Sequence, residues 1–364
     1  MKECTWQEVK NKVQSINLPE QEIKAANIVL FGVGRSGESA HKKLGNICHI
    51  VAFSDNNPKL WGGKINGIEI IEPCRLPQID KAMIIIAMSD QQCCAAVKKQ
   101  LDELNIKCIT YAEYVIANHF AEFEMVYEQL LEDECSKSTY RNILMSHLEV
   151  DPEYLKTVFS TEQQYFALPE FNIPSAQEVF VDCGAYVGDA MEMYIFNRSG
   201  TFKKMYLFEP VPKTYQALSY RRERLLKEWA LEEEQIIVEK KAVSAEDRIV
   251  AFTNETNKSS SNRIKEEAGD MDEAIQAVSL DHYFENMEDK PSFIKADIEG
   301  MEGDLIQGAE GIIRENRPLI AICAYHNIED LYELPLKIKQ LNGTYKMAVR
   351  HHMPNACETV LYCY

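Results

Sequence analysis

Two short apolar runs in this chain lead directly into a glycine-containing turn and then into a helical stretch. Residues 27–31 precede Gly32, and residues 178–181 precede the turn that contains Gly184. A continuous apolar run of this length is typical of a strand that is buried on both faces of a sheet. Strands and helices that alternate in this way predict an α/β fold with mostly parallel sheets.

Further apolar runs divide the chain into two such series. At about 150 residues per domain, a chain of 364 residues has room for two domains. We predict a small Rossmann-like domain over residues 1–110, a helical and acidic bridge over 111–170, and a second α/β domain over 171–364. The strands expected in the first domain are 27–31, 49–53, 83–87 and 108–110. Those expected in the second are 178–181, 204–208, 236–239, 250–253, 292–296 and 319–324, followed by an antiparallel hairpin of 345–350 and 358–363.

The charge balance argues against a polyanionic partner. The chain has 39 Lys and Arg against 57 Asp and Glu, a formal net charge of −18, and we find no local basic patch. We therefore expect no nucleic-acid partner. Apolar runs such as 82–88 are far shorter than the ~20 residues that span a bilayer, and the polar start of the chain lacks the apolar core of a signal peptide.

The cysteines indicate a reducing compartment. Eleven cysteines are scattered along the chain and form no C-x-x-C pair, which is typical of reduced thiols. We expect a cytoplasmic protein with no metal site and no membrane contact. The sequence leaves the oligomeric state open, a homo-oligomer included.

The strongest local motif is VDCGAYVGD, residues 181–189. Its glycines let the backbone approach a ligand at the carboxyl end of a strand, where open α/β sheets bind their ligands. Amides at the start of the following helix can meet a ligand carboxylate, and Asp182 can pair with a ligand amine. The alternative is a tight strand-to-helix turn that binds nothing.

A second motif places an acid at the end of the next strand. In LFEP, residues 207–210, Glu209 stands where a ribose diol is held, because a carboxylate accepts both hydroxyl protons. An acid at this position also suits NAD. A pyrophosphate would lie badly near Asp182 and Asp189, however, whereas a ligand with a sulfonium and an ammonium group would not. The turn therefore favours S-adenosylmethionine (SAM) over NAD.

A third motif, FIKADIEGME, gathers acids at the end of a strand expected beside the first one. Residues 293–302 contain Asp297, Glu299 and Glu302 together with Lys295. Carboxylates so close together raise each other's pKa or share a cation. The alternative is a solvated acidic loop.

In combination these motifs resemble the FkbM family of SAM-dependent methyltransferases. The segments that carry the resemblance, over residues 160–364, are VDCGAYVGD, YLFEP, KKAVS, SLDHYF, FIKADIEGMEGDLIQGAEGII and RHHMPNACETVLY. The resemblance implies a class I methyltransferase fold, which has five parallel strands and an antiparallel C-terminal hairpin. It also implies SAM as the cofactor and O-methylation of a sugar or another small molecule.

The resemblance also assigns residues to the cofactor. It places Asp182, Gly184, Gly188 and Glu209 around SAM, and Ala242, Val243 and Ser244 on its adenine side. It places Asp297, Glu299 and Gly300 in the signature loop near the transferred methyl group.

A general base would help the acceptor hydroxyl lose its proton. We expect this role from His326, which follows the strand 319–324, or from one of Asp297, Glu299, Glu302 and His351. The alternative for His326 is a local hydrogen bond. Further candidates near the acceptor, each with a structural alternative, are Glu302, Arg350, His351 and His352.

The N-terminal turn Gly32-x-Gly34-x-x-Gly37 has the spacing of a dinucleotide fingerprint. It follows a strand and opens a helix, and Asp55 lies at the end of the second strand, 18 residues beyond Gly37. This segment resembles the Rossmann-like N-terminal domains that are fused to FkbM-type modules and to nucleotide-sugar enzymes. Nucleotide or nucleotide-sugar binding, a structural role and NAD-linked redox chemistry all stay open here, although this half has no Tyr-x-x-x-Lys pair.

Two other functions therefore compete with methyl transfer. One is a nucleotide-sugar or dinucleotide-binding platform whose methyltransferase-like half is inactive. The other is an NAD-dependent oxidoreductase built on the N-terminal half. The sequence does not reveal the methyl acceptor.

Overall fold

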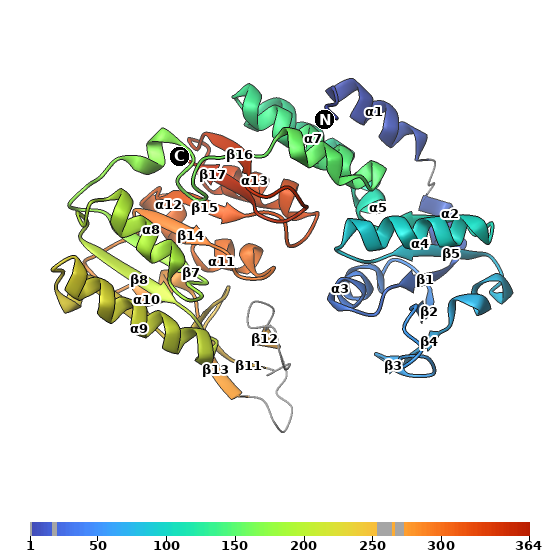
Figure 1. Ribbon diagram of the computed structural model, residues 1–364, viewed down its shortest axis with the longest axis horizontal. Helices are drawn as coiled ribbons and strands as arrows, with labels where there is room; N and C mark the ends of the chain where they lie inside the picture. Colours follow the sequence, from blue (N-terminus) through green and yellow to red (C-terminus); the bar gives the residue numbers. More distant parts are fainter. Residues whose placement is uncertain (1, 17–19, 253–263, 266–272) are drawn as a thin grey trace. The chain divides into compact units, whose positions relative to one another are not determined.

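The chain forms two units, and each has its own sheet (Figure 1). The computed structural model describes residues 2–16, 20–252, 264–265 and 273–364. The first unit spans Met1–Tyr127, Lys137–Phe159 and Met353–Ala356, and the second spans Glu128–Ser136, Ser160–His352 and Cys357–Tyr364. The mixed α/β fold with mostly parallel strands is confirmed.

The sheet of the first unit has the strand order β3-β4-β2-β1-β5-β6. Its strands are β1 (Asn27–Phe31), β2 (Ile50–Ser54), β3 (Lys64–Ile65), β4 (Ile68–Ile71), β5 (Ala82–Ile86) and β6 (Cys108–Thr110). The four predicted strands are confirmed to within one residue at each end. The antiparallel β3–β4 hairpin was missed because its strands are so short. Its turn, Asn66-Gly67 with φ of 49° and 81°, is nevertheless a strong hairpin signal.

Helices occupy most of the remainder of the first half and the predicted bridge. Those before residue 111 are α1 (Trp6–Ser15), α2 (Glu20–Ala25), α3 (Arg35–Leu44), η1 (Pro73–Gln78) and α4 (Gln91–Glu103). Within 111–170 they are α5 (Tyr111–Asn118), α6 (Phe120–Met125), η2 (Val126–Leu130), α7 (Glu134–Glu149), η3 (Pro152–Thr157) and η4 (Pro169–Asn172). The segment is helical as predicted, and its residues are shared between the two units.

The second unit is built on a seven-stranded sheet with the order β16-β17-β15-β14-β7-β8-β9. Its strands are β7 (Val179–Cys183), β8 (Lys204–Phe208), β9 (Ile236–Glu239), β14 (Phe293–Ala296), β15 (Leu319–Cys323), β16 (Met347–His351) and β17 (Thr359–Cys363). β9, β8, β7, β14 and β15 are parallel, and β17 is antiparallel to both of its neighbours. The predicted five parallel strands and closing hairpin are therefore confirmed.

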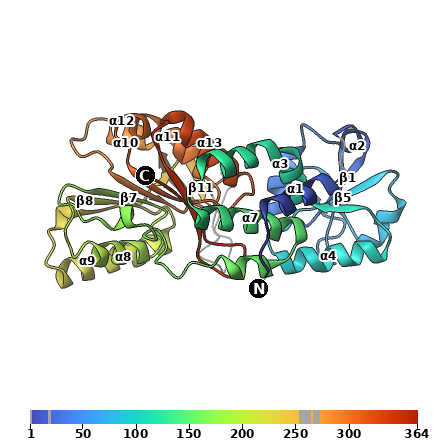
Figure 2. The ribbon, with the colours of Figure 1, turned by 90° about the horizontal axis from the view of Figure 1, so that it is seen from above.

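Helices cover both faces of this sheet. Figure 2 shows α8 (Asp189–Asn197) and α9 (Pro212–Glu228) on one face. It shows four helices on the other face, namely α10 (Leu280–Phe284), α11 (Glu302–Gly308), α12 (Glu310–Glu315) and α13 (Asp330–Leu341). A single 3-10 turn, η5 (Glu233–Gln235), precedes β9.

A separate four-stranded sheet corrects one prediction. It consists of β10 (Ala242–Val243), β11 (Arg248–Phe252), β12 (Ile264–Lys265) and β13 (Glu273–Val278), in the order β10-β13-β11-β12. The strand expected at 250–253 is β11, which lies here and not in the main series, and Thr253 is outside the described residues. β11 buries Val250 but leaves Ile249 68% exposed, so it is a one-faced strand and not one covered by helices on both sides.

The register of the central strands brings the three motifs of the second half together. Lys295 on β14 lies opposite Asp182 on β7, and Cys183 lies opposite Phe208 on β8. Gly184, Glu209 and Asp297 each follow one of these strands directly, so all three lie at the same carboxyl edge of the sheet, where α/β proteins bind their ligands.

Candidate active site

Asp182 and Lys295 form a buried ion pair beneath the glycine turn. Asp182 Oδ1 lies 2.9 Å from Lys295 Nζ, and the two side chains are 0% and 4% exposed. Burial raises the pKa of Asp182, and the positive charge of Lys295 acts in the opposite direction but does not cancel the rise. Burial also opposes the charge of Lys295, but Asp182 and Asp297 outweigh it and keep the pKa of Lys295 above its ordinary value. Lys295 therefore takes the place that was expected for a ligand amine, and the buried Asp182 side chain faces Lys295.

The turn itself depends on two glycines with positive φ. Gly184 has φ of +81°, and a Cβ there would lie 2.0 Å from the carbonyl oxygen of Asp297. Its own carbonyl accepts a hydrogen bond of 2.8 Å from Lys295 Nζ. Gly188 has φ of +82° and is the N-cap of α8, which it leaves without a side-chain cap. Since the first amides of a helix have no partner inside it, those of α8 can meet an anion at this edge.

Gly184→Ala is expected to destabilise the second unit by about 3 kcal/mol or more, because the strained φ and a clash with backbone act together. Gly67→Ala is a matched control. Gly67 also has φ of +81°, but a Cβ there meets nothing within 4 Å, so only the conformational cost of about 1–2 kcal/mol applies. Urea unfolding of the full chain measures both. Equal losses would show that the contact with Asp297 does not constrain the turn.

Glu209 is held in place by three donors. Its Oε2 accepts from the N–H of Tyr186 at 2.8 Å, and its Oε1 accepts from the N–H of Val211 at 2.9 Å and the hydroxyl of Thr214 at 2.7 Å. Burial raises the pKa of Glu209, and these hydrogen bonds oppose that rise. A carboxylate offers about four acceptor positions. One position on Oε2 is therefore left for a ligand hydroxyl, where the sequence predicted that two would be bound.

Ala242 and Val243 form β10, and both are buried. β10 pairs with β13 in the four-stranded sheet. Ser244 follows it and donates its N–H to the carbonyl of Val278 at 2.9 Å. The adenine-side role expected of this segment stays a prediction.

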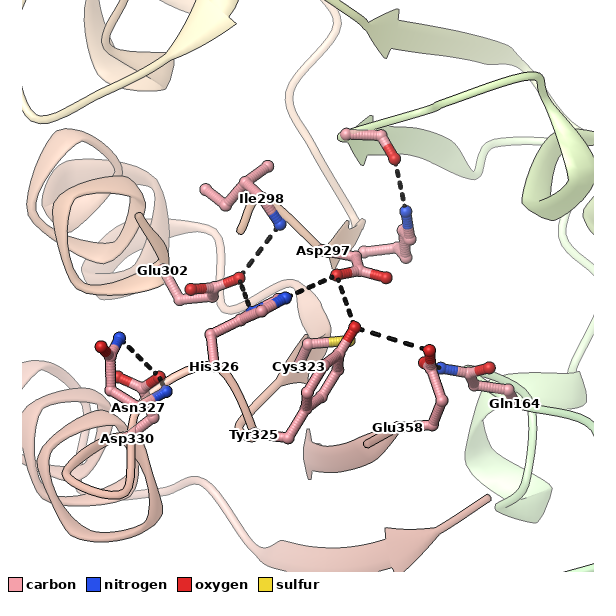
Figure 3. Close-up of polar contacts among 12 residues, drawn as sticks. Gln164, Asp297, Ile298, Glu302, Cys323, Tyr325, His326, Asn327, Asp330 and Glu358 are labelled. Carbon is pink, nitrogen blue, oxygen red and sulfur yellow. Dashed lines mark hydrogen bonds and ion pairs between the residues drawn. The ribbon is translucent and has the colours of Figure 1, made fainter. Parts of the chain in front are cut away.

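Asp297 is the centre of a polar cluster that also contains Tyr165, Tyr325, His326 and Glu302 (Figure 3). We call these five residues the Asp297 cluster. The Tyr165 hydroxyl donates to Asp297 Oδ2 at 3.0 Å, and the Tyr325 hydroxyl lies 3.4 Å from Oδ1. The Asp297 side chain is 24% exposed, so a ligand can reach the carboxylate.

His326 lies between two carboxylates. Its Nδ1 is 2.9 Å from Glu302 Oε1, and its Nε2 is 3.5 Å from Asp297 Oδ1. Burial disfavours the charged imidazole, but Glu302 and Asp297 outweigh it and raise the pKa of His326 to about 9. In this arrangement the imidazole already carries its proton at neutral pH, so it is not poised to act as the expected base.

Negative charge is crowded around the cluster. The Tyr325 hydroxyl also lies 3.5 Å from Glu358 Oε1. Burial and the charge of Asp297 raise the pKa of Glu358. Burial and the charge of Glu302 raise the pKa of Asp330 to about 7. A cationic group at this edge would therefore be stabilised.

Among the other expected acceptor-side residues, His351, His352 and Arg350 have local partners, and the catalytic role expected of Glu299 stays a prediction. Glu299 lies in the turn after β14 with φ of +58°. His351 Nδ1 lies 2.9 Å from the Thr359 hydroxyl, and His352 Nε2 lies 3.0 Å from the Tyr362 hydroxyl. Burial lowers the pKa of His352 to about 4. The guanidinium of Arg350 donates to the Ser136 hydroxyl and pairs with Asp133 at 3.2 Å. These contacts tie the C-terminal hairpin to residues 128–136 of the same unit.

Sequence reasoning missed Tyr165, Tyr325 and Glu358 as members of the site. Tyr165 is 132 residues away from Asp297 in the chain, and no local pattern marks it. Lys295 did carry a signal, since a lysine inside the apolar run FIKA must find a buried partner.

The three N-terminal glycines have the distinct structural roles of the glycines in a dinucleotide-binding turn: a tight turn, an open approach to the backbone, and close packing of the helix. Gly32 has φ of +108°, and a Cβ on Gly37 would lie 2.0 Å from the Gly32 carbonyl oxygen, whereas a Cβ on Gly34 meets nothing within 4 Å. Asp55 closes the turn, accepting from the N–H of Val33 at 3.2 Å and from that of Asn57 at 2.8 Å.

The order of the seven strands and the ligand edge at β7, β8 and β14 define a class I methyltransferase fold. Residues 182–343 match the model of the methyltransferase FkbM domain, and this part of the chain is an FkbM methyltransferase domain. The match supports methyl transfer as the class of activity. Residues 24–110 match the model described as C2185-like, N-terminal. No curated protein matches the chain.

One of the similar solved structures supports this fold. A methyltransferase FkbM from Methylobacillus flagellatus KT is similar over 98% of both chains, with 22% identity and a TM-score of 0.58. An rRNA methylase from Streptococcus thermophilus covers 56% of this chain and 97% of its own, with 12% identity and a TM-score of 0.33. Fibrillarin from Aeropyrum pernix, solved with natively bound SAM, covers 53% of this chain and 69% of its own, with 10% identity and a TM-score of 0.31. Among the helices that the structure describes, none combines the length and apolar character needed to cross a membrane.

Proposed function

We propose that this chain is a cytoplasmic, SAM-dependent O-methyltransferase that acts on a hydroxyl of a sugar or another small molecule. The observation that supports this most directly is the convergence of three motifs at one sheet edge. The glycine turn follows β7, the Glu209 carboxylate follows β8, and the Asp297 cluster lies at the ends of β14 and β15.

The residues at this edge fit SAM. The uncapped start of α8 suits its carboxylate, and the remaining acceptor position of Glu209 suits one ribose hydroxyl. SAM supplies a methyl group that is already activated on a positively charged sulfur. The crowded carboxylates around Asp297 favour a positive charge at the same edge.

Asp297 is the residue that we assign to the acceptor hydroxyl. Because the methyl group is already activated, the main task of the protein is to align the acceptor oxygen. Tyr165 and Tyr325 hold the Asp297 carboxylate in one orientation. The proton of the hydroxyl passes to Asp297 and not to His326, whose imidazole is already protonated.

Calorimetric titration of the full chain tests this proposal. S-adenosylhomocysteine is expected to bind with one site per chain, and NAD is expected to give no heat from the methyltransferase domain. Transfer of a labelled methyl group from SAM to hydroxylated acceptors, but not to their deoxy analogues, would then support O-methylation. A folded chain that binds no S-adenosylhomocysteine contradicts the proposal.

The N-terminal unit supports a second function, the binding of a nucleotide sugar or dinucleotide. The observation that favours it is the open space at Gly34. In the sequence, Gly34 stands between Gly32, which has a positive φ, and Gly37, which packs closely against the carbonyl of Gly32. In a fingerprint turn this middle position is where the pyrophosphate approaches the backbone.

Gly34→Val is expected to abolish this binding without unfolding the unit. Gly34 has φ of −77°, which any residue adopts, and a Cβ there meets nothing within 4 Å. Titration with UDP-glucose and with NAD, before and after the substitution, gives the result. If the unaltered chain binds neither ligand, the N-terminal unit has a structural role. If a ligand binds and Gly34→Val does not weaken its binding, the ligand lies at another site.

A further inference from the structure

The Asp297 cluster contains a donor set that methyl transfer by itself does not require. Asp297, Glu302 and His326 each place a nitrogen or oxygen atom within 4.8 Å of those of the other two. One imidazole with carboxylates is a donor set that suits Mn²⁺, Fe²⁺ or Zn²⁺. We propose that this cluster binds one divalent cation, with His326 Nε2 and the Asp297 carboxylate as the direct ligands.

The separation of the two ligand atoms supports a shared ion. His326 Nε2 and Asp297 Oδ1 are 3.5 Å apart, which is longer than the usual 2.7–3.2 Å hydrogen bond. Two donors bound to one ion, each at about 2.1 Å, stand about 3.0–3.4 Å apart. Nε2 has no hydrogen-bond partner among the described residues, although the His326 side chain is only 7% exposed. A buried nitrogen that makes no hydrogen bond, although it faces a carboxylate at 3.5 Å, calls for a physical reason. A cation bound between the two groups supplies that reason.

Glu302 acts as a positioning residue for His326. It is the first residue of α11, is fully buried, and accepts the N–H of Ile298 at 3.0 Å through Oε1. The same oxygen lies 2.9 Å from His326 Nδ1. Histidines that bind metals usually give their second nitrogen to a carboxylate in this way, which orients the ring. Figure 3 shows Glu302, His326 and Asp297 in this order.

The cation site suggests a substrate class, and this step rests on the proposed function. Two protein ligands leave positions on the ion for oxygens of the acceptor, as is usual where Mg²⁺ or Mn²⁺ meets its substrate. An acceptor with two adjacent oxygens, such as a vicinal diol, fills two of them. The ion lowers the pKa of the bound hydroxyl and holds its oxygen in line with the methyl group. Binding the ion releases the imidazole proton to solvent. Nε2 is then occupied by the ion, so His326 does not act as the base in this state either.

Titration of the full chain with Mn²⁺, followed by electron paramagnetic resonance, tests the proposal without SAM. Because a net charge of −18 attracts Mn²⁺ to many surface acids, the decisive signal is the electron spin echo modulation from a directly bound nitrogen. We expect one such Mn²⁺ per chain and loss of the nitrogen signal in His326→Asn. Glu302→Gln is expected to weaken binding about 10- to 100-fold.

A matched control is His282→Asn together with Asp247→Asn. These residues also pair an imidazole with a carboxylate, at 2.6 Å, but the His282 side chain is 65% exposed. Their replacement is expected to leave the nitrogen signal unchanged. Absence of the signal from the unaltered chain, or its persistence in folded His326→Asn, overturns the proposal. If His326→Asn does not fold, unchanged affinity in Glu302→Gln overturns it instead.

The same protein separates this proposal from the proposed function. S-adenosylhomocysteine is titrated with and without Mn²⁺. Binding of S-adenosylhomocysteine with no nitrogen-bound Mn²⁺ removes the cation site and leaves methyl transfer standing. Nitrogen-bound Mn²⁺ without any binding of S-adenosylhomocysteine leaves the cation site and removes methyl transfer.

Discussion

Glu209→Gln is expected to weaken the binding of S-adenosylhomocysteine about 10- to 100-fold. The substitution keeps the size of the side chain but removes a charged acceptor, and a hydrogen bond to a charged group contributes about 1.5–3 kcal/mol. The new amide also faces the N–H of Tyr186, which Glu209 now holds at 2.8 Å. The turn that follows β7 therefore loses one of its anchors. Calorimetry of the full chain measures the change.

Asp289→Asn is the control for this substitution. Asp289 is also a largely buried acid, with 10% of its side chain exposed, and it pairs with Lys204 at the start of β8. It therefore lies at the opposite end of the strand that Glu209 follows, and the affinity for S-adenosylhomocysteine is expected to stay unchanged. An unchanged affinity in folded Glu209→Gln would contradict the ribose role of Glu209. Equal losses in both variants would point to a general loss of stability.

Lys295→Met is expected to lower the free energy of unfolding of the second unit by about 3–5 kcal/mol. The substitution leaves the carboxylate of Asp182 buried without its partner, and breaking a buried ion pair on one side has this cost. Methionine replaces the apolar stem of the lysine, so the volume lost is small. Urea unfolding followed by circular dichroism measures the change.

Asp182→Asn in the Lys295→Met background is expected to recover most of that stability, because no buried charge remains. The double variant should also still bind S-adenosylhomocysteine, since the Asp182 side chain is fully buried. Loss of that binding in a folded double variant would show that Asp182 contacts the ligand. Arg224→Met breaks exposed pairs with Glu192 and Glu228 and should change stability far less. A similarly small effect of Lys295→Met would contradict the buried pair.

Much of the fold could be predicted because strands covered on both faces have a distinctive composition. The runs that became β1, β5, β7, β8, β14 and β15 are almost wholly apolar, and a glycine or an acid directly follows four of them, β1, β7, β8 and β14. One-faced strands lack this pattern. β13 alternates exposed and buried residues, and β11 was assigned to the wrong sheet for the same reason.

The candidate site was predicted in part. Gly184, Gly188, Glu209 and Asp297 follow directly from motifs at strand ends, and parallel strands bring those ends together. The partners of these residues did not follow. Tyr165 contacts Asp297 across 132 residues of chain, and such a contact leaves no local trace in a single sequence.

The sequence by itself determined where each strand ends and which acids and glycines stand there, because hydrophobic patterning and turn chemistry are local. Only the tertiary structure decided which of those groups face a ligand and which face each other. The parallel register of β7 and β14 sets Asp182 against Lys295, and the approach of α11 sets Glu302 against His326. Both pairings arise from packing between distant segments. Burial then decides which charged side chains are shielded from solvent and which, like Asp297, stay accessible to a ligand.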